Sequence, residues 1–370
     1  MLKALCWKPA RNVKLNLHGG RHISNRAEGL SPSPATGEDE GSEKNSRQVR
    51  AAARRRVCVP VLEHFDKFYS EQLRHRWPAV REILLHPQSW QYGVMLNRFA
   101  ALEEVKEQLH IQGFSSLLPH CQGSLQCFVH RSPVRFPSQR HQAGQLKQYY
   151  LLNAASLLPV LALDVNKGDR VLDLCAAPGG KALAIFQCAT PGGLHCNELD
   201  IHRHKWLMKT LESFIPQSLS DVVKVSNLDG RLFGKIEAGA YDKVLVDAPC
   251  SNDRSWLFLG QPQQGHLRLG ERAKLPGLQK DLLRSALEAV VPGGLVVYST
   301  CTLSHAENSD VIQDILSSCP NVELEDLDDL ALSLAHHFTF DANTRFGLLV
   351  VPDHGRTWGP MFVSKLKKIR

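Results

Sequence analysis

The spacing of apolar residues divides the chain into regions with different predicted structures. Residues 57–85 place apolar side chains at helical spacing, and residues 90–109 show a second helical pattern. Residues 111–148 are rich in glycine, proline, serine and glutamine and are expected to be irregular. Residues 148–164 predict another helix, which breaks near its proline because proline lacks an amide hydrogen. We therefore predict a small, mainly helical module over residues 57–150.

From Gly168 onward, short apolar runs alternate with helical patterns. The predicted strands are 170–175, 193–199, 222–227, 241–248, 294–300, 347–352 and 360–366. The predicted helices are 181–189, 201–214, 275–291 and 305–318. This alternation predicts βαβ units, and hence an α/β domain over residues 151–370 with a largely parallel sheet.

The carboxyl ends of the predicted strands carry the polar and small residues of interest. Right-handed crossovers bring these ends to one edge of a parallel sheet, where ligands bind. The segments that end there are DLCAAPGGK (173–181), CNELD (196–200), SNLDG (226–230), DAPCSN (247–252) and YSTCT (298–302). We expect the functional site at this edge.

The N-terminal residues differ in composition from the rest. The first acidic residue is Glu28, and the six basic residues before it alternate with apolar ones. A basic, acid-free, amphipathic N-terminus is typical of a mitochondrial transit segment, which we place at residues 1–35. A disordered basic tail is the alternative. Residues 36–56 are polar and rich in proline, glycine and serine, and we expect a disordered linker there.

The net charge of +7 lies in this N-terminal region. Residues 1–56 hold 12 Lys/Arg and 5 Asp/Glu, so residues 57–370 hold 32 of each. An RNA-binding surface must therefore arise from local clusters rather than from overall charge. Two candidates are the acid-free stretch from Gln108 to Leu163 and the basic residues 364–370, although an ordinary solvated surface would give the same pattern.

Length and composition limit the class of protein. The chain has 370 residues, 43% hydrophobic and 22% charged, which suits one large domain with an accessory module. No apolar run approaches the roughly 18 residues of a membrane-spanning helix, so we expect no membrane contact. The ten cysteines include no CxxC pair, so neither a metal site nor a dithiol redox motif is indicated. Scattered thiols suit a reducing compartment.

The segment Asp173–Lys181 predicts a cofactor loop. Its alanines and glycines let a ligand approach the backbone, and the following helix offers free N–H groups. It matches neither the dinucleotide nor the Walker motif. Glu198 and Asp229, at the next two strand ends, are placed to bind ribose hydroxyls and an adenine amino group. These features favour S-adenosylmethionine over a dinucleotide, although a tight turn with surface acids would also produce them.

Cys250 and Cys301 stand at two strand ends of the same edge, each beside polar residues. Pro249 fixes the backbone direction, so that Asp247 and Cys250 can both face the pocket. A small buried hydrophobic residue is the alternative for any strand cysteine. We assign that role to the remaining cysteines of this region: Cys175, Cys188, Cys196 and Cys319.

Two thiols and a carboxylate beside a methyl donor suit methylation of a pyrimidine at C5. A thiolate that adds to C6 makes C5 nucleophilic. Asp247 can stabilise the adduct by protonation or hydrogen bonding at N3. A second cysteine can then assist loss of the C5 proton and release of the nucleophile.

The motifs DLCAAPGGK, DAPCSN and YSTCTLSHAEN resemble those of the Nop/Sun-domain RNA cytosine-5 methyltransferases over roughly residues 168–370. The resemblance implies a class I, Rossmann-like methyltransferase sheet that uses S-adenosyl-L-methionine. It makes Cys301 the nucleophile and Cys250 the residue for product release, with Lys181 facing the target base or the cofactor. The implied cofactor contacts are Cys175, Ala176, Ala177, Pro178, Gly179, Gly180, Lys181, Glu198, Asp229 and Asp247.

The segments HFDKFYS, WQYGVMLNRF and DAPCSNDRSWLF resemble the mitochondrial members of that family. They resemble most closely the member that methylates wobble cytosine 34 of mitochondrial methionine tRNA, giving the precursor of 5-formylcytosine. This implies binding of the anticodon stem-loop, no DNA substrate, a matrix location and a monomer. No PUA-type domain is recognisable, so residues 57–150 would grip the RNA. The alternatives are a mitochondrial small-subunit rRNA methyltransferase and a non-catalytic RNA-binding assembly factor.

Overall fold

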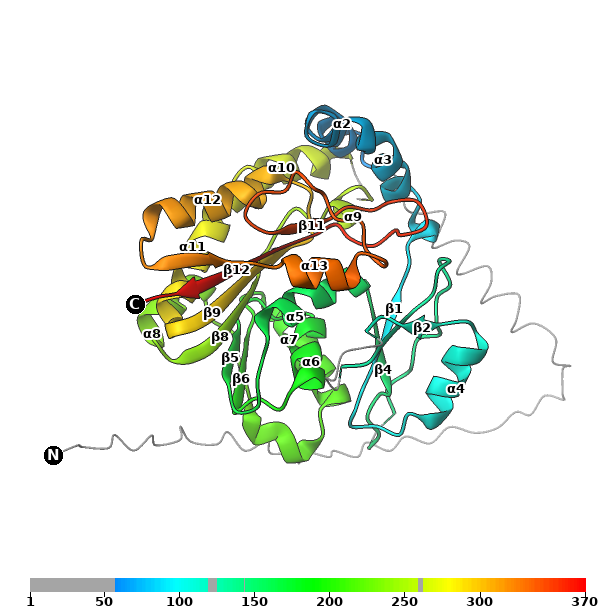
Figure 1. Ribbon diagram of the computed structural model, residues 1–370, viewed down its shortest axis with the longest axis vertical. Coiled ribbons are helices and arrows are strands. Elements are labelled where there is room, and N and C mark those ends of the chain that lie inside the picture. The colour runs from blue at the N-terminus through cyan, green and yellow to red at the C-terminus, as the bar shows by residue number, and fades with distance from the viewer. Residues whose placement is uncertain (1–56, 119–124, 143, 259–261) are drawn as a thin grey trace, which may run out of the picture. The chain divides into compact units, whose positions relative to one another are not determined.

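The computed structural model describes residues 57–118, 125–142, 144–258 and 262–370 (Figure 1). The predicted transit segment and linker therefore lie outside the described residues. The described residues belong to one compact unit. The expected boundary at residue 150 falls inside a strand, Tyr149–Leu152, which pairs with residues 93–96 in the sheet of the N-terminal module.

An eight-stranded sheet forms the centre of this unit. Its order is β10 (Val322–Glu325), β12 (Met361–Lys368), β9 (Val290–Thr300), β8 (Tyr241–Asp247), β5 (Arg170–Asp173), β6 (Gly193–Asn197) and β7 (Val223–Ser226), with β11 (Leu348–Val350) beside β12. The strands from β9 to β7 are parallel, and β12 is antiparallel to β9. All seven predicted strands are confirmed. The short β10 was not predicted.

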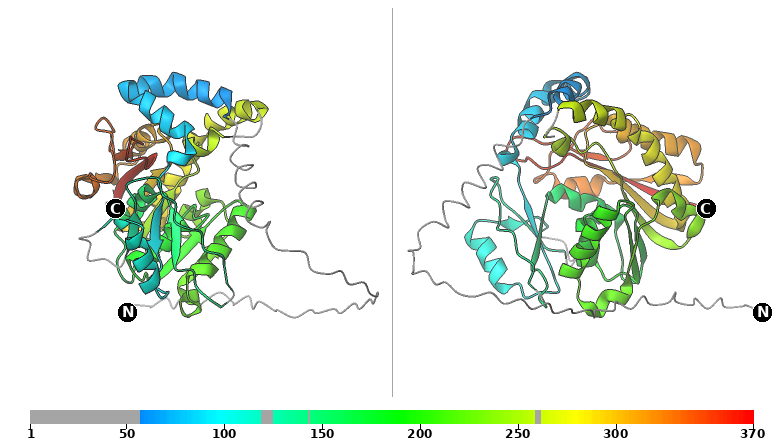
Figure 2. Two further views of the ribbon diagram at one scale, coloured as in Figure 1. Left: turned by 90° about the vertical axis from the view of Figure 1, so that its right-hand side faces the viewer. Right: turned by 180° about the vertical axis from the view of Figure 1, so that it is seen from behind.

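The helices cover both faces of the sheet (Figures 1 and 2). Those at the predicted places are α6 (Gly180–Cys188), α7 (Ile201–Phe214), α11 (Leu275–Ala289) and α12 (Ser309–Ser318). The others after residue 150 are α5 (Leu158–Leu163), α8 (Phe233–Ile236), α9 (Asp253–Trp256), α10 (Pro262–Arg272) and α13 (Asp328–Leu334). No helix among the described residues is long and apolar enough to span a bilayer.

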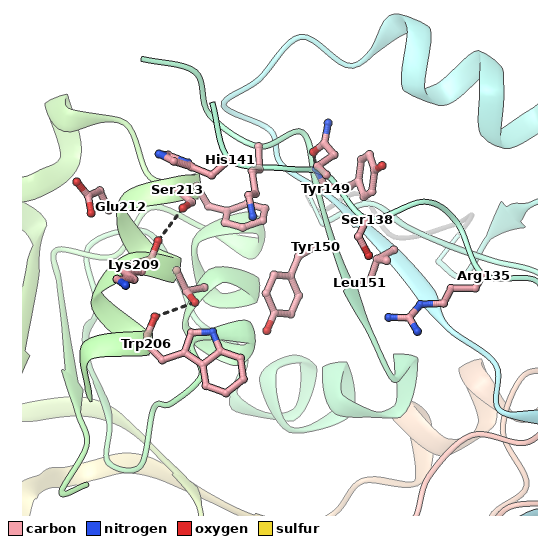
Figure 3. Close-up of a pocket in the computed structure, with 14 residues that line it drawn as sticks. Arg135, Ser138, His141, Tyr149, Tyr150, Leu151, Trp206, Lys209, Glu212 and Ser213 are labelled. Carbon is pink, nitrogen blue, oxygen red and sulfur yellow. Dashed lines mark hydrogen bonds between the residues drawn. The ribbon is translucent and has the colours of Figure 1, made fainter. Parts of the chain in front are cut away.

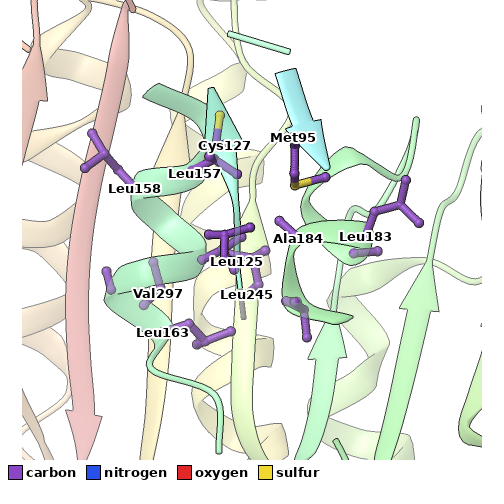
Figure 4. Close-up of a cluster of buried hydrophobic side chains, with 14 of the residues drawn as sticks. Met95, Leu125, Cys127, Leu157, Leu158, Leu163, Leu183, Ala184, Leu245 and Val297 are labelled. Atoms are coloured by element: carbon purple, nitrogen blue, oxygen red, sulfur yellow. The ribbon is translucent and has the colours of Figure 1, made fainter. Parts of the chain in front are cut away.

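Alternate side chains of the central strands pack into two apolar clusters, one on each face. Leu245 of β8 packs in one cluster with Leu163 of α5 and Leu183 of α6 (Figure 4). Its neighbours Val244 and Val246 belong to the other cluster. Because both faces are covered, the central strands are apolar throughout, and the polar groups that follow them gather at the strand ends.

The N-terminal module contains α2 (Val59–Leu73), α3 (Trp77–Leu85) and α4 (Glu103–Ile111), and also a four-stranded antiparallel sheet. The order of that sheet is β2 (Ser115–Ser116), β3 (Cys127–Val129), β1 (Gly93–Leu96) and β4 (Tyr149–Leu152). The description of the module as mainly helical is therefore incomplete.

Two predicted helices of this region are wrong where they overlap β1 and β4. Residues 93–96 and 149–152 are strands, and each helical pattern continues correctly only farther along, in α4 and α5. The reason is long-range pairing: Met95 pairs with Cys127 on one side and with Tyr150 on the other. Such partners override the local helical spacing of apolar residues.

Candidate active site

The predicted cofactor loop joins β5 to α6 and is packed from two sides. Gly179 has φ +109°, and a Cβ there would lie 3.1–3.2 Å from Thr210 and Leu207 of α7. A Cβ on Gly180 would lie 2.9 Å from the ring of Tyr150. The two glycines therefore let α7 and β4 close in on the loop, which fixes the position of the backbone that faces the sheet edge.

A cavity of about 160 Å³ lies between this loop and β4. It brings together the loop residues Ala176, Ala177, Pro178 and Gly180 with Lys181 and Asp247, as predicted. Cys175, the first loop residue, is half-buried and packs against the apolar cluster on one face of the sheet. Five further residues line the cavity that were not predicted as site residues: Tyr150, Leu151, Leu152, Ser156 and Asp173.

Asp173 ends β5 with its carboxyl group fully buried and without a hydrogen-bond partner on either oxygen. Burial, followed by the nearby charges of Asp247 and Glu198, raises the pKa of Asp173 to about 8. An unsatisfied carboxyl group at a cavity wall is an acceptor for a ligand that carries N–H donors or positive charge. Its position at the end of the first strand, directly before the loop, is the sequence signal that could have identified it.

Lys181 and Asp247 form an ion pair across the cavity, with Nζ and Oδ2 2.7 Å apart. The other oxygen of Asp247 accepts a hydrogen bond from Ser299 Oγ at 2.9 Å. Burial lowers the pKa of Lys181, but the charge of Asp247 and its hydrogen bond outweigh burial, so the pKa is raised. The pair therefore presents a fixed ammonium group with protons to donate.

Glu198 and Asp229 stand at the ends of β6 and β7, as predicted, but they do not line the cavity. Glu198 is buried and lies 3.2 Å from Arg203, which also donates to the carbonyl of Ala177 in the loop. Asp229 forms a two-pronged ion pair with Arg231, whose hydrogen bonds lower the pKa of Asp229. Their roles at ribose and adenine stay predictions.

The two predicted cysteines lie side by side, with their Sγ atoms 3.3 Å apart. Both thiols are half-buried rather than enclosed in the core. The backbone N–H of Cys301 also points to the sulfur of Cys250, at 3.3 Å. The hydrogen bond with Cys301, together with burial, raises the pKa of Cys250 well above its usual value. Cys250 therefore holds its proton beside the sulfur of Cys301.

A buried polar network joins the loops that carry the cysteines. Glu307 accepts hydrogen bonds from the backbone N–H and the hydroxyl of Ser251, at 2.9 and 2.7 Å. Asp253 accepts from Thr302 Oγ1 at 2.9 Å and from the backbone N–H of Leu303 at 2.7 Å. Each carboxylate thus ties the segment after Cys250 to the segment after Cys301.

Two side chains from distant parts of the chain complete this network. Tyr69 of α2 donates to Asp253 at 2.9 Å and accepts from Arg272 of α10 at 2.6 Å. Arg272 Nε also lies 3.4 Å from Glu307. Neither residue was predicted for the site, because a tyrosine on an amphipathic helix and an isolated arginine carry no recognisable motif.

Among the described ranges, no group of three or more His, Cys, Asp or Glu side chains is arranged to hold a metal ion. The groups that this edge offers for chemistry are the two thiols, the Lys181–Asp247 pair and the cavity lined by Asp173.

The chain is similar in sequence to known proteins. A family model described as 16S rRNA methyltransferase RsmB/F matches residues 160–367. A zebrafish protein named mitochondrial tRNA (cytosine(34)-C(5))-methyltransferase is 57% identical over 333 residues, covering 87% of this chain and 91% of its own length. A mouse protein of the same name is 52% identical over 319 residues, covering 85% and 92%. The mouse 5-cytosine rRNA methyltransferase NSUN4 is 40% identical over 342 residues, covering 84% and 88%.

Solved structures show the same fold at lower identity. A methyltransferase homologue from Pyrococcus horikoshii has a TM-score of 0.58 at 24% identity, covering 80% of this chain and 91% of its own. NSun6 from the same organism has a TM-score of 0.57 at 15% identity, covering 84% and 98%. These likenesses confirm the predicted class I, Rossmann-like methyltransferase fold.

Proposed function

Because the chain belongs to the RsmB/F family of S-adenosylmethionine-dependent RNA cytosine-5 methyltransferases, we propose that it methylates cytosine 34 of mitochondrial methionine tRNA. The single observation that carries the chemistry is the contact of Cys250 and Cys301 at 3.3 Å, at the edge where the cofactor loop ends. The 57% and 52% identities to proteins named for cytosine 34 of tRNA support the substrate.

The charge of the groups beside the loop suits S-adenosyl-L-methionine. The buried carboxyl group of Asp173 has no partner on either oxygen, and the ligand's amino group and sulfonium carry the positive charge that this acceptor needs. The loop residues 175–181 would hold the ligand, with Glu198 and Asp229 at the neighbouring strand ends. When bound, the cofactor supplies an electrophilic methyl group.

Cys301 acts as the nucleophile. Its thiolate adds to C6 of cytosine, the double bond between C5 and C6 opens, and C5 becomes an enamine-type carbon that can accept a methyl group. The Lys181 ammonium group, held by Asp247 at 2.7 Å, is placed to hydrogen-bond the base on its N3 side. Asp247 thus acts together with Lys181, because both of its oxygens are already engaged as acceptors.

Cys250 serves product release. Its raised pKa, caused first by the hydrogen bond with Cys301 and then by burial, makes it a thiol that holds a proton next to the sulfur that must leave. After methyl transfer, C5 loses its proton to a base, and Cys301 departs as C5 and C6 regain their double bond. Cys250 stabilises the departing thiolate by donating its hydrogen bond.

The anticodon loop suits such a site, because its bases are already unstacked and one can enter a pocket at low cost. We place the enzyme in the mitochondrial matrix, where its product supports translation as the precursor of 5-formylcytosine. We propose that the protein acts as a monomer without a DNA substrate or a membrane contact.

Methylation of transcribed RNAs by the purified protein tests the proposal. We expect a methyl group on mitochondrial methionine tRNA and none on the same tRNA with uridine at position 34, read by bisulfite sequencing. The 40% identity to the mouse rRNA methyltransferase supports a second candidate substrate, small-subunit rRNA. Activity on rRNA fragments alone would contradict the tRNA substrate. A non-catalytic assembly factor would methylate neither.

A further inference from the structure

We infer that a groove beside the catalytic cavity holds the single-stranded nucleotides that flank the target base, and that one of them stacks on Trp206. The inference rests on the proposed function and deepens it, since it names the surface that holds the RNA. The groove, which we call the α7 groove, has a volume of about 710 Å³ and is lined by residues of α7 and of the 135–151 segment. Figure 3 shows Trp206 and Tyr150 projecting into the space between α7 and β4.

One wall of the groove is held in place by hydrogen bonds. The amide oxygen of Gln139 accepts hydrogen bonds from the backbone N–H groups of Gln148 and Tyr149, at 2.8 and 3.3 Å. The hydroxyl of Tyr149 donates to the carbonyl of Pro137 at 2.8 Å. The backbone N–H of Lys147 donates to the carbonyl of Ser213 on α7 at 2.9 Å. These bonds join residues 137–139 to residues 148–149 and hold Lys147 against α7.

The charges that line the α7 groove are mostly positive. Arg135, Lys147 and Lys209 contribute cations and His141 adds an imidazole, against a single acid, Glu212. Within the described ranges, no carboxylate forms an ion pair within 4.0 Å with any of the three cations. Arg135 and Lys147 lie over the rings of Tyr92 and Phe214, at 4.8 and 5.9 Å from the ring centres. An aromatic ring does not neutralise the charge of a cation, so the three cations can still attract phosphate groups.

Some surface cations elsewhere on the protein are paired: Arg81 lies 2.7 Å from Asp66, and Arg170 lies 3.2 Å from Asp242. Others, such as Lys235, form no ion pair within the described ranges. The groove is therefore distinguished by its combination of three cations and an exposed indole on one concave surface, and not by the lack of ion pairs alone.

Trp206 is the aromatic residue that distinguishes this groove. Its side chain is 63% exposed, although tryptophan is the largest apolar residue and gains most from burial. Tyr150 lines the same groove and is partly buried. An exposed indole next to unpaired cations is the combination by which proteins hold single-stranded RNA, because every base offers a face for stacking.

The α7 groove adjoins the cavity beside the cofactor loop. Tyr150 and Leu151 line both. The ring of Tyr150 lies on the cofactor loop, since a Cβ on Gly180 would be 2.9 Å from it. The groove and the cofactor cavity are thus separated by one tyrosine side chain, so nucleotides in the groove lie close to the cofactor.

The occupant is single-stranded RNA because of what the groove combines. A surface that binds a protein partner would have an apolar centre with few charged residues. An RNA duplex would be held through phosphates and ribose hydroxyls, with its bases unavailable for stacking. Interleaved cations and an exposed indole match a strand whose bases are unpaired, as in an anticodon loop.

Binding of a fluorescein-labelled anticodon stem-loop RNA, followed by anisotropy with the full-length protein, tests the groove independently of turnover. We expect Trp206→Ala to weaken binding about 5- to 150-fold, from the roughly 1–3 kcal/mol of a stacked base. Trp206→Phe should restore most of the affinity. Lys209→Gln should reduce the slope of log affinity against log salt by about 0.7. Lys235→Gln, an exposed lysine of α8 outside the groove, is the matched control and should bind as wild type.

The outcomes separate the groove from the proposed function. Wild-type affinity in Trp206→Ala, or equal competition by a duplex RNA of the same length, overturns the groove even if the tRNA is methylated. Weak binding by Trp206→Ala supports the groove even if no RNA is methylated, and in that case the proposed function fails instead. In the methylation assay, the expected change for Trp206→Ala falls on KM rather than on kcat.

Discussion

Two parts of the same sheet edge differ in how completely their polar groups are satisfied. At the ends of β8 and β9, the carboxylates of Asp253 and Glu307 each accept hydrogen bonds on both oxygens. At the end of β5, the carboxyl group of Asp173 is equally buried and accepts none. The cysteines are therefore held in place by the protein itself, whereas the cofactor side is completed only by a ligand.

The largest expected effect is the loss of turnover on removing the nucleophile, at the strand ends whose polar groups are all satisfied. Cys301→Ala should lower turnover by at least about 10⁴-fold, because C5 of cytosine is not activated without the C6 adduct. Transfer of a labelled methyl group to the tRNA measures it. Cys196→Ala, which removes a buried thiol from β6, is the control and should keep turnover. Substantial activity in Cys301→Ala would contradict the assignment of the nucleophile.

Removing the second cysteine, Cys250, should have a different effect, since this residue should act after methyl transfer. Cys250→Ala should accumulate a covalent protein–RNA adduct, because the departing thiolate of Cys301 loses its hydrogen-bond donor. Denaturing gels detect the adduct as a slower band that nuclease removes. The double variant Cys250→Ala/Cys301→Ala should show no such band. Normal product release by Cys250→Ala would contradict the role of Cys250 in releasing the product.

Breaking the network behind the cysteines should cost stability as well as turnover. Glu307→Ala leaves the buried Arg272 and the N–H of Ser251 without their acceptor, so we expect a loss of about 3–5 kcal/mol. Urea unfolding measures it. Asp314→Ala removes an acid that pairs at the surface with Lys280 and should cost about 0–1 kcal/mol. Similar losses in both variants would show that the network adds nothing, and the milder Glu307→Gln tests this if the alanine variant fails to fold.

The smallest effect, on stability, is expected at the end of β5, where the carboxyl group of Asp173 has no hydrogen-bond partner. The pKa of Asp173 is raised to about 8, mainly by burial, so between about pH 4 and pH 8 the folded protein holds a proton that the unfolded chain has lost. Stability without ligand should therefore fall as pH rises through this range. Asp173→Asn cannot titrate and should show a flatter decrease in Tm from pH 6 to pH 8.

The same variant should weaken S-adenosylmethionine binding about tenfold, measured by calorimetry, because a charged acceptor is lost. Wild-type affinity should rise from pH 6.5 to pH 8.5 as Asp173 ionises in favour of the cationic ligand. Equal pH slopes of Tm in the two proteins, together with equal affinities, would show that Asp173 lies outside the cofactor site.

The main sheet could be predicted because each of its central strands has a recognisable local sequence pattern. Tyr241–Asp247, for example, is an apolar run that ends in an acid and is soon followed by a proline. The N-terminal sheet could not, since β1 and β4 pair across more than 50 residues and their apolar spacing also suits a helix. Local pattern carries no information about such partners.

The residues of the site also fall into two groups, those that sequence motifs predict and those that only the tertiary fold brings there. The loop, Lys181, Asp247 and both cysteines follow from motifs next to strand ends, and the structure brings the loop, Lys181 and Asp247 to one cavity and the two thiols together. Tyr69 and Arg272 join the network behind the cysteines only through the tertiary fold, 184 and 19 positions from Asp253 along the chain. No sequence motif marks a residue whose partner lies that far away.

The hydroxyl of Tyr69 makes the catalytic half dependent on the segment that precedes it. Its helix also holds the loop after Cys301, since Gln72 donates to the carbonyl of Leu303 and accepts from the N–H of His305. The family-matched residues 160–367 are therefore no self-sufficient unit. Expressed alone, that fragment would expose the carboxylate of Asp253 to solvent and lose the clamp on its nucleophile loop, so a minimal enzyme has to begin before α2.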